Sequence, residues 1–373
     1  MKTYDHGGTT GRAVLALDIG GTKLAAGVVR EDGTALSFVT CPTEGQEGPD
    51  AVLDRLFTLG ASALSDAGIE AARADGPLIG CGIGCGGPLD SAAGVLIAPP
   101  HLPGWLNIPV TALAQDAYGL PAVLDNDGTA GAAGEWRFGA GRGSRHLVYL
   151  TVSTGIGGGV VIDGRTYRGA AGNGGEPGHV TVRSEGRRCR GCGRTGCLEA
   201  YASGTSIAER AHEAMRHAAE RGESTTLVAV PPPAAADVAR AAREGDKLAS
   251  RVWHETVDAL AGGLTSIINL WEPEIVVLGG GVLRSGDQLL LPLREKVAQL
   301  AMGPAADAAR IVPAEAGDLA GVLGAAAIAF ERLAADPSRP GISPVATAPA
   351  TRPVPPVTAR PSAGPHPRTA PVS

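Results

Sequence analysis

Residues 18–23 read DIGGTK and close an apolar run, AVLALDI, at residues 13–19. The run predicts a buried strand, and the glycine pair predicts a tight turn where a ligand can approach the backbone closely. Such a loop offers an aspartate for Mg²⁺, amides and a hydroxyl for phosphate oxygens, and a lysine charge nearby. The alternative is an ordinary β-hairpin turn. We expect phosphate binding, with Mg²⁺ held through the aspartate, by Asp18, Gly20, Gly21, Thr22 and Lys23.

The same arrangement returns later in the chain. Residues 146–164 again contain a strand, a glycine-rich turn and a strand, and LGGGV at 278–282 follows another apolar strand. Two such loops can grip one polyphosphate, and the third glycine group leaves room for a flat adenine or ribose. Apolar positions at helical spacing predict helices at 51–67, 246–270 and 320–333. The pattern predicts two related α/β halves, with ATP-binding residues Thr154, Gly155, Gly279, Gly280 and Gly281.

A carboxylate suited to acid–base chemistry lies in LDNDGTAGAAGEW at residues 124–136. Asn126 and Asp127 stand where a short strand gives way to an Ala-rich helix, so simple helix capping is the alternative. In the functional interpretation, Asp127 is a general base that accepts the proton of a sugar hydroxyl as it attacks a γ-phosphate. Asn126 can exchange hydrogen bonds with a neighbouring hydroxyl.

Three cysteines in CRGCGRTGC, residues 189–197, stand in an otherwise cysteine-poor chain. Zinc normally takes four ligands, and GGEPGHV at 174–180 supplies the nearest histidine. The alternative is a thiol-rich turn without metal. The predicted zinc ligands are His179, Cys189, Cys192 and Cys197.

Zinc would cross-link a glycine-rich loop that has few apolar side chains to stabilise it. It would also fix the His179 ring, leaving the second ring nitrogen for a substrate hydroxyl. Glu199 follows the last cysteine closely, so the same zinc cross-link can orient its carboxylate toward the sugar. Residues 179–182, HVTV, are predicted to form a strand. Cys81 and Cys85 lie in an apolar run and are interpreted as packing residues.

Composition excludes several classes of function. The chain has 373 residues, a net charge of −6 and a pI near 5.8, so no broad basic field is available for nucleic acid or an anionic membrane. No apolar run approaches the ~18–20 residues that span a bilayer, and the N-terminal residues lack the apolar segment of a signal peptide. We expect a cytoplasmic protein.

Together the motifs resemble the ROK family of sugar kinases, open reading frames and repressors, within the actin-like ATPase superfamily. The quoted motifs, together with GIGCGGPLD at 82–90, occur in the family's order over about residues 12–333. The resemblance implies a two-domain actin-like (ribonuclease H-like) α/β fold with the active site in a cleft between the domains. The expected parts are a small domain of 12–124 plus 318–334, a large domain of 125–317, and a disordered, proline-rich tail of 335–373.

The resemblance also implies ATP with Mg²⁺, structural zinc and phosphorylation of a hexose at the 6-hydroxyl, with glucokinase as the nearest member type. Asp127 matches the catalytic base, which also contacts the sugar. Three features depart from the family pattern: Thr129 stands where Asn is usual, Cys85 stands where proline is common, and the cysteine spacing is one residue longer before Cys192. The implied sugar ligands are Asn126, Asp127, Glu176, His179, Glu199 and Gly87.

Other functions remain open at this stage. A repressor would need a DNA-binding helix-turn-helix before the kinase-like core, and only seventeen residues precede Asp18. A catalytically silent sugar-binding regulator would be expected to lack the base. The hexose is not specified, since N-acetylmannosamine, fructose or allose could use a similar polar set, and the donor could be ATP or polyphosphate. A homodimer is expected from the resemblance.

Overall fold

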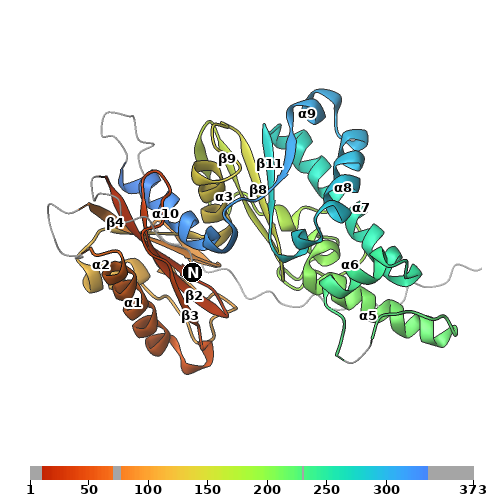
Figure 1. The fold of residues 1–373 in the computed structure, drawn as a ribbon, viewed down its shortest axis with the longest axis horizontal. Helices are drawn as coiled ribbons and strands as arrows, with labels where there is room; N and C mark the ends of the chain where they lie inside the picture. The colour runs from red at the N-terminus through yellow and green to blue at the C-terminus, as the bar shows by residue number, and fades with distance from the viewer. Residues whose placement is uncertain (1–10, 70–76, 229–230, 335–373) are drawn as a thin grey trace, which may run out of the picture. The chain divides into compact units, whose positions relative to one another are not determined.

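Two five-stranded sheets with the same strand order form the frame of the protein (Figure 1). The computed structural model describes residues 11–69, 77–228 and 231–334. Each sheet begins with a three-strand antiparallel meander and then adds two strands parallel to the first strand of that meander. The repeated topology confirms the predicted pair of related α/β halves.

The strand bounds place both predicted phosphate turns between the first two strands of a sheet. In the order β3-β2-β1-β4-β7, the first sheet contains Val39–Pro42, Lys23–Arg30, Ala13–Ile19, Leu78–Cys85 and Ala122–Asn126. In the order β10-β9-β8-β11-β12, the second sheet contains Arg165–Tyr167, Ile156–Ile162, Leu147–Val152, Ile275–Gly279 and Arg310–Pro313. A separate two-stranded sheet pairs β5 (Leu89–Asp90) with β6 (Val95–Leu96).

Helices cover both faces of the first sheet. On one face α1 (Pro49–Asp66) and α2 (Val110–Tyr118) bury alternate apolar residues of β1, such as Leu15 and Leu17. The opposite face packs on α10 (Ala320–Leu333), which buries a continuous run of small and apolar side chains. Alternate burial on two faces is expected for a central strand enclosed by helices.

The helix α3 (Asp127–Phe138) lies between the two sheets. Ala130 and Ala133 pack with α10 against the first sheet, whereas Ala132 packs against the second. Gly134 permits close approach, since a Cβ there would lie 2.9 Å from the Gly324 nitrogen of α10. The Ala/Gly-rich sequence of α3 therefore lets one helix serve both sheets.

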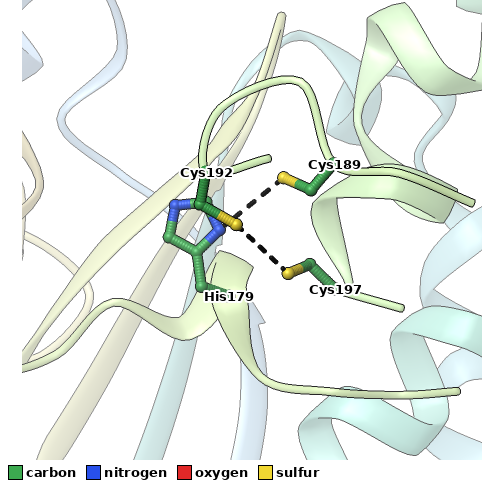
Figure 2. A group of neighbouring side chains, drawn as sticks. All are labelled: His179, Cys189, Cys192 and Cys197. Atoms are coloured by element: carbon green, nitrogen blue, oxygen red, sulfur yellow. Dashed lines mark hydrogen bonds between the residues drawn. The ribbon is translucent and has the colours of Figure 1, made fainter. Parts of the chain in front are cut away.

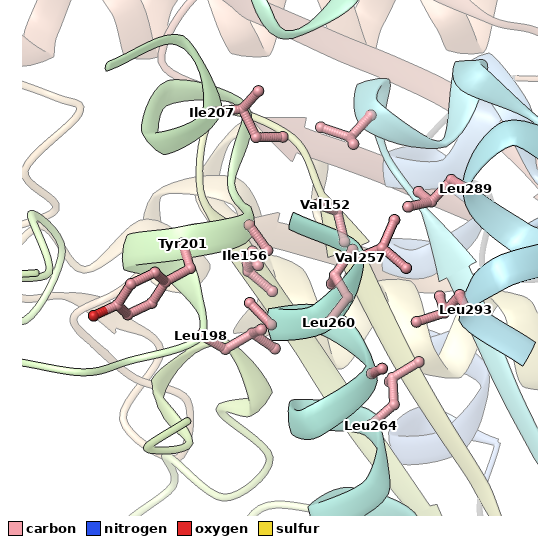
Figure 3. Packing of buried hydrophobic residues seen from close by; sticks show 14 of the residues in the cluster. Val152, Ile156, Leu198, Tyr201, Ile207, Val257, Leu260, Leu264, Leu289 and Leu293 are labelled. Atoms are coloured by element: carbon pink, nitrogen blue, oxygen red, sulfur yellow. The ribbon is translucent and has the colours of Figure 1, made fainter. Parts of the chain in front are cut away.

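The remaining helices cover the outer face of the second sheet (Figure 3). Their shared core contains Val152, Ile156, Leu198, Leu260 and Leu293. The bounds are α4 Glu199–Ala202, α5 Gly204–Glu220, α6 Ala235–Arg243, α7 Lys247–Trp271, α8 Asp287–Leu300 and α9 Gly303–Ala308. Short 3-10 turns occur at Gly45–Glu47, Pro177–His179, Gly281–Ser285 and Gly317–Leu319.

Most predicted elements are confirmed, and one is wrong. The helices predicted at 51–67, 246–270 and 320–333 correspond to α1, α7 and α10. The strand predicted at 179–182 is wrong, because His179 ends a 3-10 turn and only Thr181 forms a bridge, to Cys197. In the described ranges no helix is both long and apolar enough to cross a bilayer.

The described residues form one compact unit. The division into domains of 12–124 plus 318–334 and of 125–317 stays a prediction. The tail predicted to be disordered, 335–373, lies outside the described residues.

Candidate active site

Asp127 occupies the first turn of α3, directly after β7. The Asn126 side chain caps the helix by accepting a hydrogen bond from the Gly128 amide at 2.9 Å. The same amide also donates to Asp127 Oδ1 at 2.8 Å, and Oδ2 accepts no hydrogen bond from the described residues. Capping is therefore performed mainly by Asn126, and Asp127 keeps one carboxylate oxygen for other chemistry.

Protein atoms around the Asp127 carboxylate alter its acidity, although the residue reaches solvent. Loss of hydration raises the pKa of Asp127, while the Gly128 amide and His101 lower it. The net shift is upward. A raised pKa makes the ionised carboxylate a better proton acceptor, as a general base requires.

Asp18 lies at the end of β1, where the first phosphate turn begins. Burial, followed by the charge of Asp127, raises the pKa of Asp18 to about 6, and Lys23 opposes this shift. The carboxylate also presses on the first turn of α10, since a Cβ on Gly321 would lie 2.1 Å from Asp18 Oδ2. A helix N-terminus attracts negative charge, so this position suits an ionised Asp18.

Two glycines of the first turn are required by close contacts. A Cβ on Gly20 would lie 2.7 Å from the Lys23 carbonyl oxygen, and one on Gly21 would lie 3.0 Å from His101 Cβ. The backbone is fixed further by the Gly20 amide, which donates to the Lys23 carbonyl at 3.1 Å. Thr22 and Lys23 are exposed at the rim of this turn.

His101 was not singled out by sequence, yet it joins several parts of the site. Its ring lies over Gly86, where a Cβ would come within 2.6 Å of His101 Cε1, and its Nε2 is 3.9 Å from Cys85 Sγ. Burial lowers the pKa of His101, against the opposing charge of Asp127. The available signal was a histidine in the turn-rich stretch PPHLPGW at 99–105.

The predicted sugar residues lie in one neighbourhood. A Cβ on Gly87 would lie 3.6 Å from Asn126 Nδ2, which brings the turn after β4 beside the start of α3. Loss of hydration raises the pKa of Glu176, His179 lowers it, and the charges of Asp127 and Glu199 raise it. Asp127, His179 and Glu199 therefore all influence the protonation of Glu176, and the four residues come from three segments of the chain.

The His/Cys cluster consists of His179, Cys189, Cys192 and Cys197 (Figure 2). One ligand atom from each residue lies within 4.8 Å of all the others, with 3.8 Å between His179 Nδ1 and Cys189 Sγ and 3.5 Å between Cys192 Sγ and Cys197 Sγ. Sulfurs bound to one tetrahedral zinc are separated by roughly 3.8 Å, given Zn–S bonds of ~2.3 Å. The donor set and spacing fit zinc, and the longer spacing before Cys192 leaves Cys189 within the cluster.

The surroundings of the cluster also favour the thiolate form of Cys192 and orient the His179 ring. Loss of hydration favours the neutral Cys192 thiol, but hydrogen bonds from Arg194 and from the other two cysteines lower the pKa of Cys192 to about 6. The Nδ1 atom of His179 faces the sulfurs, and the second ring nitrogen points away from them (Figure 2). The division of the His179 ring between metal and hydroxyl stays a prediction.

Glu199 connects this cluster to the second phosphate turn. Its Oε2 accepts a hydrogen bond from the Ile156 amide at 2.9 Å, and its Oε1 accepts one from Cys189 Sγ at 3.1 Å. A Cβ on Gly155 would lie 2.8 Å from Glu199 Oε2, so only glycine fits easily there.

The second and third glycine turns border a common cavity of about 340 Å³. Thr154 and Gly281 line it, and Gly280 adopts a φ of +92° that brings it against the Val152 backbone. The lining also includes Ala234, Ala235 and Ala236 at the start of α6, which sequence reasoning missed because alanines carry no chemical signal. The mainly apolar lining suits an aromatic base.

Comparison with known proteins places these features in a family. The model of the ROK family matches residues 14–332. This chain belongs to the ROK family. Among ROK relatives, the glucokinase of Thermotoga maritima is 39% identical over 323 residues, covering 86% of this chain and 98% of the relative. The N-acetylmannosamine kinase of Shigella flexneri is 33% identical, covering 85% and 98%.

Solved ROK structures agree with the fold. The ROK hexokinase of Thermus thermophilus matches with a TM-score of 0.70 and 35% identity, covering 86% of this chain and 98% of that one. The ROK glucokinase of Streptomyces griseus, solved with glucose and AMPPNP, matches with a TM-score of 0.68 and 31% identity, covering 86% and 99%. The predicted two-domain α/β fold of an actin-like ATPase is confirmed at the level of the fold.

Two residues at which this ROK chain departs from the family pattern, Thr129 and Cys85, are both buried. Thr129 is 4% exposed within α3, and a Cβ on Gly159 of β9 would lie 2.9 Å from its Cα. Cys85 is fully buried at the end of β4, beside His101. Cys81 is likewise buried in β4, as expected for a packing residue.

Proposed function

We propose that this protein is an ATP-dependent hexose kinase, with glucose as the preferred sugar and glucose 6-phosphate and ADP as products. The observation that carries the proposal is the position of Asp127, whose carboxylate stands at the start of α3 with Oδ2 free of described hydrogen bonds. The charge of Asp127 raises the pKa of Asp18 and of Glu176, and His101 lowers the pKa of Asp127. The high similarity to glucokinases supports glucose as the sugar.

In the proposed reaction, Asp127 accepts the proton of the sugar 6-hydroxyl. The hydroxyl oxygen forms a bond to the γ-phosphorus while the bond from that phosphorus to the bridging β-phosphate oxygen breaks, and ADP leaves. Asn126, Glu176, His179, Glu199 and the Gly87 turn orient the sugar through hydrogen bonds. Closure of the two predicted domains would exclude water and limit hydrolysis of ATP.

The nucleotide is proposed to use both sheets. The cavity beside Thr154 and Gly281 takes the adenine and ribose. Gly155, Gly279 and Gly280 lie next to these two lining residues in the same glycine turns. The phosphates lie along the first turn, against Gly20, Gly21, Thr22 and Lys23. Mg²⁺, when bound, neutralises charge on the transferred phosphoryl group, and Asp18 is the residue that would hold it or its waters.

The His/Cys cluster is proposed to bind structural zinc through His179, Cys189, Cys192 and Cys197. Zinc, when bound, cross-links a loop that otherwise has few apolar contacts. The protein then holds His179 and Glu199 in fixed orientations for the sugar hydroxyls.

Other features stay predictions within this proposal, namely a cytoplasmic location and a homodimeric state. N-acetylmannosamine is the second candidate sugar, because one kinase for it is 33% identical over most of both chains. A catalytically silent regulator is the alternative that Thr129 favours.

The decisive experiment is ADP release from MgATP across glucose, mannose, fructose, allose, N-acetylglucosamine and N-acetylmannosamine, repeated with polyphosphate as donor. Strong stimulation by glucose with ATP would support the proposal. Stimulation by another sugar would change the substrate, and no stimulation by any sugar, in a folded protein that contains zinc, would favour the silent regulator.

A further inference from the structure

A second cavity, of about 560 Å³, lies beside the segment that carries the His/Cys cluster, residues 179–197 (the His/Cys loop), and away from the residues assigned above. Four segments line it: residues 183–187, Tyr201 of α4, α5 and α7. Its charged lining comprises four arginines and two glutamates, together with one histidine, in a protein whose net charge is −6. The charged groups are Arg183, Arg187, Arg210, Arg251, Glu213 and Glu255.

Arg210 forms the buried floor of this arginine cavity. It is 6% exposed, and its guanidinium donates to the Tyr201 carbonyl at 2.8 Å and to Glu255 at 3.0 Å. Its Nε has no hydrogen-bond partner in the described part of the chain. Glu255, its only ion-pair partner among the described residues, is 57% exposed, so water weakens that compensation.

Two further arginines at the cavity lack close carboxylates. Arg183 stacks on the Tyr201 ring, 5.0 Å from the ring centroid, and forms no ion pair within the described ranges. Arg251 comes no closer than 4.0 Å to Glu223, and both side chains are about half exposed. Arg187, in contrast, is paired with Glu213 at 2.5 Å.

The positive charges also repel one another. Burial lowers the pKa of Arg210, Glu255 raises it, and repulsion from Arg187 and Arg183 lowers it further. Guanidinium groups bind phosphate and carboxylate oxygens through paired hydrogen bonds. A cavity of this volume is also within the size range of small-molecule sites.

We propose that the arginine cavity binds a small phosphate-bearing molecule, with Arg183 and Arg251 as its principal anion contacts. A phosphate dianion would compensate the two arginines that lack close carboxylates. Arg210 holds the floor through Tyr201 and Glu255 and remains a structural residue.

The site is joined to the sugar residues by short covalent and hydrogen-bonded paths. The Arg187 amide donates to the Tyr201 hydroxyl at 2.9 Å, and Tyr201 lies on α4, which begins at Glu199. An anion that fixes residues 183–187 and Tyr201 also restricts Glu199. This coupling rests on the proposed function, whereas anion binding itself does not.

The test measures thermal stability of the full chain with inorganic phosphate, pyrophosphate or glucose 6-phosphate, against chloride at equal ionic strength. Saturating MgADP and glucose are present throughout, so that the phosphate turns are filled. The variant R183A/R251A is compared with R142A/R240A, which removes the same charge from two exposed arginines that do not line the cavity. At ten times the dissociation constant, a bound anion should raise the melting temperature by roughly 2–4 °C.

The expected result is a rise in the parent and in R142A/R240A that is largely lost in R183A/R251A. The three anions separate free phosphate from a phosphate carried on a sugar. Equal rises in all three proteins would locate the anion elsewhere and overturn the proposal, as would no rise with any anion in a folded parent. Because the readout is binding, these outcomes are independent of whether the kinase reaction is observed.

Discussion

Glu199 accepts a hydrogen bond from Cys189 across 3.1 Å, which places a predicted sugar ligand in direct contact with a predicted metal ligand. The other Glu199 oxygen is held by the Ile156 amide at the start of β9. A thiolate bound to metal carries no proton to donate, so the same carboxylate oxygen would become available for a sugar hydroxyl. Metal content and sugar affinity should therefore change together.

Replacing Cys192 by serine tests this link. Cys192→Ser should reduce zinc from about one ion per chain to a small fraction, because it removes one of the four ligands. The variant should also bind glucose more weakly and melt at a lower temperature. Zinc is measured by atomic emission on undenatured protein, and glucose affinity by calorimetry. Cys41→Ser, outside the cluster, is the matched control, and a parent protein without zinc would refute the metal site.

Asp127→Asn should separate catalysis from binding. The amide keeps the size and some hydrogen bonds of the carboxylate but cannot accept the hydroxyl proton, so kcat should fall at least ~100-fold while the glucose dissociation constant changes little. Asp116→Asn, at an exposed position on α2, controls for loss of one negative charge. Unchanged turnover in Asp127→Asn would remove this residue from the role of base.

Activity should decline at mildly acidic pH. Asp18 titrates at about 6 and the pKa of Asp127 is also raised, so both carboxylates gain protons as the pH falls toward and below 6. Protonation removes the proposed Mg²⁺ ligand and the proposed base, and kcat/KM for glucose should fall accordingly. Lys23→Met removes a charge that lowers the pKa of Asp18 and should move the acidic limb to higher pH. A flat profile down to pH 4.5, near the ordinary range of aspartate, would contradict this assignment.

Gly281→Leu should block the proposed nucleotide cavity without unfolding the protein. A Cβ at this position meets no atom within 4 Å, and the new side chain would project beside Thr154 and the start of α6. KM for ATP should rise at least ~10-fold, by loss of shape complementarity, with little change in glucose affinity. Gly303→Leu, equally uncrowded and outside the cavity, is the control. An unchanged KM for ATP would place the adenine outside this cavity.

Two Arg–Asp ion pairs test whether burial determines how much such a pair contributes to the free energy of unfolding. Asp125, with a side chain 1% exposed, accepts a hydrogen bond from Arg168 Nε at 2.7 Å, and it immediately precedes Asn126 and Asp127. Asp125→Ala should cost about 3 kcal/mol in the free energy of unfolding, because it removes a buried carboxylate from a largely buried arginine and leaves Arg168 only the longer contact to Glu331 at 3.5 Å.

The exposed pair of Arg145 and Asp163, at 2.5 Å, gives the comparison. Arg145→Ala should cost under about 1 kcal/mol in the free energy of unfolding, because water and salt screen that pair. Urea denaturation measures both changes. Equal losses would show that burial does not set the strength of these pairs.

Much of the frame was predictable because its signals are local. The turns at Gly20 and Gly155 follow apolar strands and recur in the same setting, so the repeated sheet topology could be inferred from the chain itself. The three cysteines and His179 were also recognisable, since metal-ligand spacing is a short-range pattern.

Other contacts depend on tertiary packing and left no such signal. His101 meets Gly21 and Gly86 only after the strands are aligned. The strand predicted at 179–182 failed because the His/Cys loop takes its order from cross-loop bonds, such as the Leu198 amide donating to the Val180 carbonyl at 2.9 Å. The arginine cavity likewise joins segments about 70 residues apart, whose charges look like ordinary surface residues in the sequence.

The position of α10 bears on the order in which the chain can fold during synthesis. This helix begins at residue 320, yet it covers a face of the sheet built from residues 13–126. The ribosome therefore releases the first sheet long before its covering helix exists, and Val14, Ala16 and Val29 stay uncovered until nearly the whole core has been made. Any chain ending before α10 exposes that apolar face, which is a route to aggregation and a point of contact for chaperones.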